Sequence, residues 1–352
     1  MIRLEWKNDQ LDFFRPGQLF PESVRDPSSR TSLHRVPEVT SPETGSMKNV
    51  ACVLLWCVKL AAMLGVFLIC FILGSSAVGT ALPSDALTEP GPVPSTIAFA
   101  LIAATHVMVV TLLIVGSRWG GWKLTVAVSL VYFGVVTGLP QLETWYFLAG
   151  RTVDPHLLPR LFLMGVPPAF LFVPFSVWVL GKGKSQMHPE NASWRAFRFS
   201  HWFKRALPLA MLYVVLYWTA GYFIAWQNPQ LREFYGHPGP PQPFFSHTLQ
   251  TLRETPFFWV FQLIRGILWV ACATPIVYGS RWGPVATALI VGLFFSLPQN
   301  LMLLLPNPFM PSASVRLTHL VETAVSSFVF GILVALLLDG FPKPRRREYN
   351  RL

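Results

Sequence analysis

Long apolar stretches alternate along this chain with short polar or proline-rich ones. A helix that crosses the hydrocarbon core of a bilayer needs about 20 consecutive, mostly apolar residues. Eight stretches meet this length, and we predict transmembrane helices at 50–73, 95–117, 123–147, 157–181, 206–227, 256–279, 284–305 and 316–338. Several contain proline, which membrane helices tolerate and which predicts kinks. The pattern therefore predicts an all-α integral membrane protein.

Composition supports the membrane class. Charged residues make up 13% of the 352 residues, whereas soluble domains carry about 25%. The formal net charge is +11, but the basic residues flank apolar stretches, so we assign them to orientation in the bilayer rather than to nucleic acid. The cysteines lie inside apolar stretches and are predicted to be packing residues: Cys52, Cys57, Cys70 and Cys272. The sequence contains no cofactor-binding motif, and we predict no cofactor.

The distribution of Lys and Arg predicts the orientation. Basic residues concentrate in 182–205 and 341–352, and they also occupy the turns at Arg118 and Arg281. With eight spans all of these segments lie on one side, whereas 74–94 on the other side holds no Lys or Arg. The positive-inside rule then places both termini in the cytoplasm of a protein of the cell membrane.

Two segments outside the spans are long. Residues 1–49 have balanced charge and no apolar stretch, so we predict a cytosolic tail that is disordered. Residues 228–255 form a proline-rich loop on the outer side. A loop of this length is usually functional or disordered, and this one is predicted to cover an outer cavity or to bind a partner protein.

An internal repeat is visible in the sequence. Residues 111–120 and 274–283 both end in Gly-Ser-Arg-Trp-Gly, and Leu-Pro-Gln recurs further along each half. Each half holds four spans, so both halves have the same orientation in the membrane. We therefore predict two parallel four-helix repeats, 50–181 and 206–340, which are joined by the basic cytosolic linker and related by a pseudo-two-fold axis along the membrane normal.

Polar side chains inside the spans are the candidate functional residues, because placing them in a membrane is costly. The stretch Pro306–Gly331 begins as a proline-broken loop and carries Arg316, His319 and Glu322 into the last span. Other polar residues lie at similar depth in the outer halves of the third, sixth and seventh spans. The predicted substrate- or ion-binding residues are Gln141, Glu143, Gln262, Arg265, Gln299, Asn300, His319, Glu322 and Ser326.

Two interpretations of this polar layer are open. Arg265 is expected to pair with Glu143 or Glu322, because a guanidinium matches a carboxylate. The pair either locks the two halves together or lines an outward-facing cavity. His319 and Glu322 at i, i+3 also suit a metal site with Glu143 as third ligand, but a second such pair is absent from the sequence and we predict no metal.

Two further polar residues lie within spans. His106 is predicted to be a hydrogen-bonded interior histidine rather than a ligand. Lys59 lies in the middle of the first predicted span, where its charge has no explanation from the sequence.

Three stretches resemble the signature stretches of a family of uncharacterised prokaryotic multi-pass membrane proteins. They are residues 118–123 (Arg-Trp-Gly-Gly-Trp-Lys), 133–144 and 306–331. The resemblance covers most of the membrane part and does not include the first 49 residues. It implies a fold of about eight spans in which these stretches belong together, and it implies no activity.

Three functions fit the sequence. The first is a transporter or permease with an outward-facing polar cavity, whose ligand is a small molecule, an ion or a lipid. The second is a structural or assembly subunit with an intramembrane ion-pair lock. The third is an intramembrane enzyme for a lipid-linked substrate, with His319 and Glu322 as acid–base pair and Arg265 on a phosphate.

Overall fold

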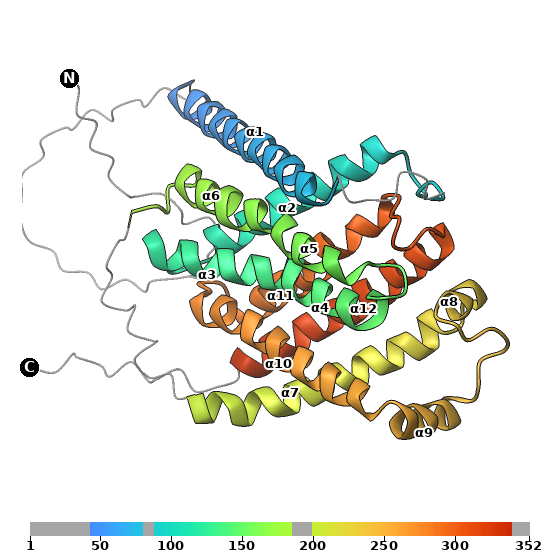
Figure 1. Ribbon diagram of the computed structural model, residues 1–352. Coiled ribbons are helices and arrows are strands. Elements are labelled where there is room, and N and C mark those ends of the chain that lie inside the picture. The colour runs from blue at the N-terminus through green and yellow to red at the C-terminus, as the bar shows by residue number, and fades with distance from the viewer. Residues whose placement is uncertain (1–42, 80–87, 185–198, 340–352) are drawn as a thin grey trace, which may run out of the picture. The chain divides into compact units, whose positions relative to one another are not determined.

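The computed structural model describes residues 43–79, 88–184 and 199–339 (Figure 1). The predictions for the tail before residue 43, for the middle of the basic linker and for the C-terminal tail lie outside these ranges. The described chain is helical and has no strand. Its helices are α1 (Glu43–Gly79), α2 (Ser95–Val115), α3 (Gly121–Phe133), η1 (Gly134–Gly138), α4 (Leu139–Leu148), η2 (Pro155–Leu157), α5 (Leu158–Met164), η3 (Pro168–Phe172), α6 (Val173–Val179), α7 (Phe199–Ala220), η5 (Gly221–Ala225), α8 (Pro229–Phe234), α9 (Phe244–Glu254), α10 (Pro256–Gly279), α11 (Pro284–Asn300), η6 (Leu301–Leu304) and α12 (Ala313–Asp339).

Eight helical stretches in the described residues are long and apolar enough to span a membrane, as predicted. They are Asn49–Gly79, Ser95–Val115, Gly121–Leu148, Pro155–Val179, Phe199–Ala225, Pro256–Gly279, Pro284–Leu304 and Ala313–Leu338. The protein is therefore a polytopic membrane protein. Most boundaries agree with the predicted ones to within a few residues.

The first span is longer than predicted, because α1 continues past residue 73 to Gly79. Its last turns pack on the bundle: a Cβ on Gly74 would collide with the backbone carbonyl of Met164, and Val78 is buried. Lys59 lies inside this span, and its ammonium nitrogen is 5.7 Å from the ring centre of Trp56.

Several spans contain a turn of π-helix, namely η1, η3 and η5. Pro140 and Pro174 explain the first two, because each lies four residues after a residue of the π-helical turn. A proline has no N–H to donate to the carbonyl four residues earlier, and its ring pushes that carbonyl away. The widened turns η1 and η5 precede the residues that carry the candidate site and are typical of functional positions.

Small residues let the spans approach closely. Gly292 of α11 faces Gly331 of α12, and a Cβ on Gly331 would lie 2.7 Å from the Cα of Gly292. Gly266 of α10 lies in the same way against Ala210 of α7. Dispersion contacts between such surfaces hold membrane helices together where lipid removes most of the hydrophobic driving force.

The two Gly-Ser-Arg-Trp-Gly turns contact each other reciprocally. The N–H of Arg118 donates to the carbonyl of Gly279 (2.7 Å), and the N–H of Arg281 donates to the carbonyl of Gly116 (2.8 Å). The ring of Trp282 lies over Gly116, where a Cβ would be 2.7 Å from it, and Trp119 lies over Gly279. The repeated pentapeptide is therefore a connection between helices with a packing role.

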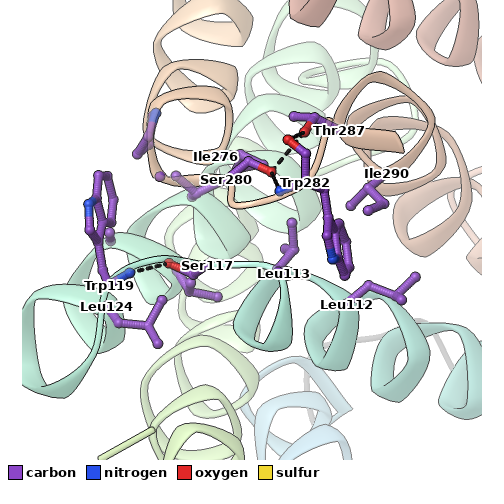
Figure 2. A pocket seen from close by; sticks show the side chains of 16 residues that line it. Leu112, Leu113, Ser117, Trp119, Leu124, Ile276, Ser280, Trp282, Thr287 and Ile290 are labelled. Atoms are coloured by element: carbon purple, nitrogen blue, oxygen red, sulfur yellow. Dashed lines mark hydrogen bonds between the residues drawn. The ribbon is translucent and has the colours of Figure 1, made fainter. Parts of the chain in front are cut away.

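Figure 2 shows this region from close by, with the backbone N–H of each tryptophan donating to the serine hydroxyl two residues earlier. The space between the turns is about 30 Å³. That is far below the roughly 300–1,000 Å³ of pockets for small organic molecules.

Replacing Gly331 with alanine is expected to destabilise the α11–α12 pair, because the new methyl group meets the backbone of Gly292. Overpacking of this kind costs about 1–3 kcal/mol. Thermal unfolding of the purified protein in detergent measures the effect. Gly65→Ala is the matched control, since no atom lies within 4 Å of its Cβ position, and equal unfolding temperatures for the two variants would contradict the prediction.

Candidate functional site

A cavity of about 950 Å³ lies among the spans, on the side of the bundle that holds the connections after α4, after η5 and after η6. We call it the polar cavity. Every predicted binding residue except Gln262 lines it: Gln141, Glu143, Arg265, Gln299, Asn300, His319, Glu322 and Ser326. Gln262 is fully buried behind Arg265. The polar residues that the sequence placed at one depth therefore surround one space.

An ion pair joins α4 to α10 at this cavity. Nη2 of Arg265 lies 2.7 Å from Oε2 of Glu143, and the hydroxyl of Tyr217 on α7 donates to the other carboxylate oxygen (2.9 Å). The side chain of Arg265 is 3% exposed and that of Glu143 is 28% exposed. Of the two partners predicted for Arg265, the structure selects Glu143.

Aromatic rings surround the guanidinium of Arg265. Its central carbon lies 5.9 Å from the ring centre of Tyr213, 5.5 Å from that of Tyr217 and 5.7 Å from that of Phe261. Its Nη1 donates to Oε1 of Gln262 (2.9 Å). Ring faces attract a cation, so the site holds the guanidinium from several sides. Sequence reasoning missed the tyrosines, although their i, i+4 spacing on one span was a readable signal.

A second hydrogen-bonded group lies on the other wall of the cavity. Nδ1 of His319 is 3.2 Å from Oε2 of Glu322, and Nε2 of the same ring is 2.9 Å from the hydroxyl of Tyr235. The side chain of Glu322 is 4% exposed. Tyr235 follows α8 in the segment that the sequence described as a loop, so its distance from His319 could not be read from spacing. Among the described residues, His319 is the only group in ion-pair contact with Glu322.

The amide side chains of the seventh span line the cavity and also form hydrogen bonds to other groups of the protein. Asn300 accepts a hydrogen bond from Thr323 (2.7 Å) and donates to the carbonyl of Ser296 (2.6 Å). Gln299 donates to the carbonyl of Phe295 (2.7 Å). In contrast, Oε1 of Gln141 is buried and has no hydrogen-bond partner in the described part of the chain.

The three-ligand metal alternative does not form. The carboxylate of Glu143 faces Arg265 and Tyr217 rather than His319 and Glu322. Within the described ranges no three His, Cys, Asp or Glu side chains come close enough to share a metal ion. The physical reason is that the guanidinium already neutralises the proposed third ligand.

Arg316 does not belong to the cavity. It is fully buried at the start of α12 and donates to the carbonyls of Met310, Pro311, Glu89 and Pro90. The carboxylate of Glu89 in turn accepts from the N–H of Ala313 (2.6 Å). This arginine therefore fastens two connections to the start of the last span.

His106 is a hydrogen-bonded interior histidine, as predicted. Its Nδ1 lies 2.6 Å from the hydroxyl of Tyr132, and its ring stacks on Phe67 with centres 4.6 Å apart. It contributes to the deep wall of the polar cavity. Its role is to complete an aromatic cluster between α1, α2 and α3.

The predicted outer loop 228–255 folds into α8 and α9 with a short connection. His247 of α9 stacks between Trp218 and Trp226, each with ring centres 5.2 Å away. Burial, and secondly the nearby His237, lowers the pKa of His247, so the stacked ring is neutral at neutral pH. The long segment is thus fastened to the fifth span.

The faces of α9 differ in character. His247, Gln250, Thr251 and Glu254 line the polar cavity. Phe245 is 79% exposed, and Leu249 and Leu252 are half exposed. The helix α9 is therefore amphipathic, with a polar face toward the cavity and an exposed apolar face on the outside.

No family model, curated protein or solved structure matches this chain. The resemblance to a family of uncharacterised prokaryotic membrane proteins therefore stays a prediction.

Replacing Arg265 with glutamine is expected to lower the free energy of unfolding by about 3 kcal/mol, because the mostly buried carboxylate of Glu143 loses its cation. Adding Glu143→Gln in the same chain is expected to restore part of the loss, since the uncompensated charge is then removed. Unfolding of the single and double variants in detergent, analysed as a double-mutant cycle, measures the coupling. Additive effects would contradict the pairing.

Proposed function

We propose that this protein is a transporter or permease that binds a drug-sized organic molecule in the polar cavity. The observation that carries the proposal is the cavity itself, at about 950 Å³. Pockets for small organic molecules measure about 300–1,000 Å³ and combine apolar walls with a few polar groups. Glu143, Arg265 and Glu322 supply the polar groups, and tyrosine, tryptophan and phenylalanine side chains supply the apolar wall. A bare inorganic ion would need a much smaller space.

The proposal includes an arrangement of two parallel four-span repeats. The reciprocal contact of the two Gly-Ser-Arg-Trp-Gly turns supports it, because each turn makes to the other the same backbone and tryptophan contacts that it receives. Glu143 comes from the first half, and Arg265 and Glu322 come from the second. Transporters built from repeats bind their substrates at such a junction.

In this proposal the cavity opens to the outside of the cell. The basic residues at Arg118, Lys182 and Arg281 lie at the turn end of the bundle, opposite the polar cavity. The positive-inside rule puts that end in the cytoplasm, together with both termini. The α9 helix would then lie in the outer leaflet interface, where its exposed phenylalanine and leucines meet lipid.

A structural or assembly subunit is the second candidate, because the Glu143–Arg265 pair joins spans from the two halves. A lock of this kind accounts for the pair but does not account for the large space beside it. The enzyme hypothesis has less support, since the carboxylate of Glu143 already neutralises the guanidinium of Arg265 that would bind a phosphate.

Side-specific labelling tests the outward opening. In a background with all native cysteines replaced by alanine, Ser326→Cys is expected to react with a membrane-impermeant maleimide added to intact cells, because Ser326 lines the cavity. Ser129→Cys is the matched control, since Ser129 is buried away from it. Reaction of Ser326→Cys only after the cells are permeabilised would contradict the proposed orientation.

A ligand-stabilisation screen tests the binding role. Drug-sized organic cations, anions and neutral compounds are added to the purified protein, and compounds that raise its unfolding temperature are retained. Glu322→Gln is expected to abolish the stabilisation by compounds that use this carboxylate, while the unfolding temperature without ligand changes little, because the amide keeps the shape of the side chain. If neither this variant nor Glu143→Gln affects any compound, the structural candidate gains over the transporter.

A further inference from the structure

We propose that Glu322, His319 and Tyr235 form a proton-binding site in the polar cavity, in which Glu322 takes up and releases the proton. This inference rests on the proposed function and deepens it, because it makes a proton one of the ligands of the cavity. It also separates the two carboxylates that the sequence had treated alike.

The two carboxylates differ in their partners. Glu143 lies 2.7 Å from Arg265, whose guanidinium is positively charged at all relevant pH values. Glu322 has no arginine or lysine within ion-pair distance among the described residues, and its contact is with the titratable His319. A carboxylate at this depth needs a positive partner or a proton. Glu322 is therefore the carboxylate whose charge can change.

The chain of contacts leads from Glu322 toward the connection after α8. His319 contacts Glu322 through one ring nitrogen and Tyr235 through the other. An imidazole can accept a proton on one nitrogen while it releases one from the other. Glu322 thus exchanges protons through a ring that is itself more exposed, at 16% of its side chain.

Proton uptake along this chain is balanced. Tyr235 donates its hydroxyl proton to Nε2 of His319 and takes a proton from hydronium in the cavity. The proton on Nδ1 of His319 passes to Oε2 of Glu322, which becomes a neutral carboxylic acid. Release is the same sequence in reverse, which restores the original tautomer of His319. Burial, with the nearby Glu143 and Glu322, raises the pKa of Tyr235 well above its usual value, so the phenol passes a proton on only by gaining another.

Titratable and charged groups from several elements face Glu322. They are His319 on α12, Tyr213 and Tyr217 on α7, Arg265 on α10, Glu143 on α4, and Tyr235 after α8 with Arg151 near it. Arg265 is attracted by the negative charges of both Glu143 and Glu322. Protonation of Glu322 removes one of these two charges. The proton therefore changes the field at the ion pair, which is a direct electrostatic coupling between proton and cavity ligand.

The backbone keeps the second oxygen of Glu322 open. Gly221 begins the π-helical turn η5, and a Cβ at this position would lie 3.9 Å from Oε1. Since glycine has no side chain, the space in front of the carboxylate belongs to the cavity. Glu322 can therefore bind the proton on one oxygen and contact a ligand with the other.

Infrared difference spectroscopy of the protein in lipid bilayers tests the site. The pH is stepped across about 4 to 9, where carboxyl and imidazole groups titrate. We expect the carbonyl stretch of a protonated carboxylic acid that is absent from Glu322→Gln and retained in Glu254→Gln, the control on an exposed carboxylate of the cavity rim. A wild type without this band, or its persistence in Glu322→Gln, overturns the proposal.

The rate of protonation tests the proton transfer through Tyr235 and His319. After a pH jump, Tyr235→Phe is expected to form the band with the same final amplitude but about tenfold or more slowly, because the outer proton donor is gone. An unchanged rate overturns the roles of Tyr235 and His319.

If Glu322→Gln does not fold, Glu322→Asp replaces it and is expected to shift the frequency of the band. An unshifted band then assigns the proton elsewhere and also overturns the proposal. If Ser326→Cys is labelled from outside the cell but the infrared band is absent, the proton site is wrong and the proposed outward-facing cavity is still supported.

Discussion

The pair between Arg265 and Glu143 is the interaction on which the arrangement of the polar cavity depends. A guanidinium inside a membrane protein is costly unless the protein compensates its charge. Here Glu143 compensates the charge, Gln262 accepts a hydrogen bond from a second nitrogen, and the rings of Tyr213, Tyr217 and Phe261 surround the guanidinium. The helices that carry these groups, α4, α7 and α10, are held in register by one cation. Their register sets the shape of the cavity beside it.

Close packing elsewhere makes an open space at this site possible. Where α11 meets α12, and α10 meets α7, glycine and alanine let the backbones touch. The paired turns at Gly116 and Gly279 close the opposite end of the bundle around about 30 Å³. Around the cavity, in contrast, the spans are interrupted by the π-helical turns η1, η3 and η5, and large aromatic side chains separate the helices. The spans therefore leave about 950 Å³ at the end that holds the polar cavity and only about 30 Å³ at the paired turns, and the proposed binding role depends on this difference.

The two carboxylates of the cavity have different hydrogen-bond partners, and this difference is the basis for the proposed chemistry. Glu143 has a permanent cation and a phenol as partners, so it serves the architecture. Glu322 has a histidine that continues to Tyr235, so its charge is free to respond to its surroundings. In the proposed chemistry, a fixed pair and a variable carboxylate that face one space give a binding site whose electrostatic field depends on a single proton. This property links the structural pair and the proposed transport function, since the same pair that holds the helices also senses the variable charge.

Much of the fold follows from local properties of the sequence. Apolar stretches of about 20 residues predict the spans regardless of how they pack, because the thickness of the bilayer sets their length. The depth of Glu143, Arg265, His319 and Glu322 also follows from their positions within those spans, and the residues do surround one cavity. What tertiary structure alone decided is which groups pair. The folding of residues 228–255 back over the spans places Tyr235 against His319. The rotation of the helices about their axes directs Glu143 toward Arg265, and it directs Arg316 toward the backbone carbonyls of the segment before α2. Such contacts join residues far apart in sequence, and hydrophobic pattern carries no information about them because lipid-facing and buried positions are equally apolar in a membrane span.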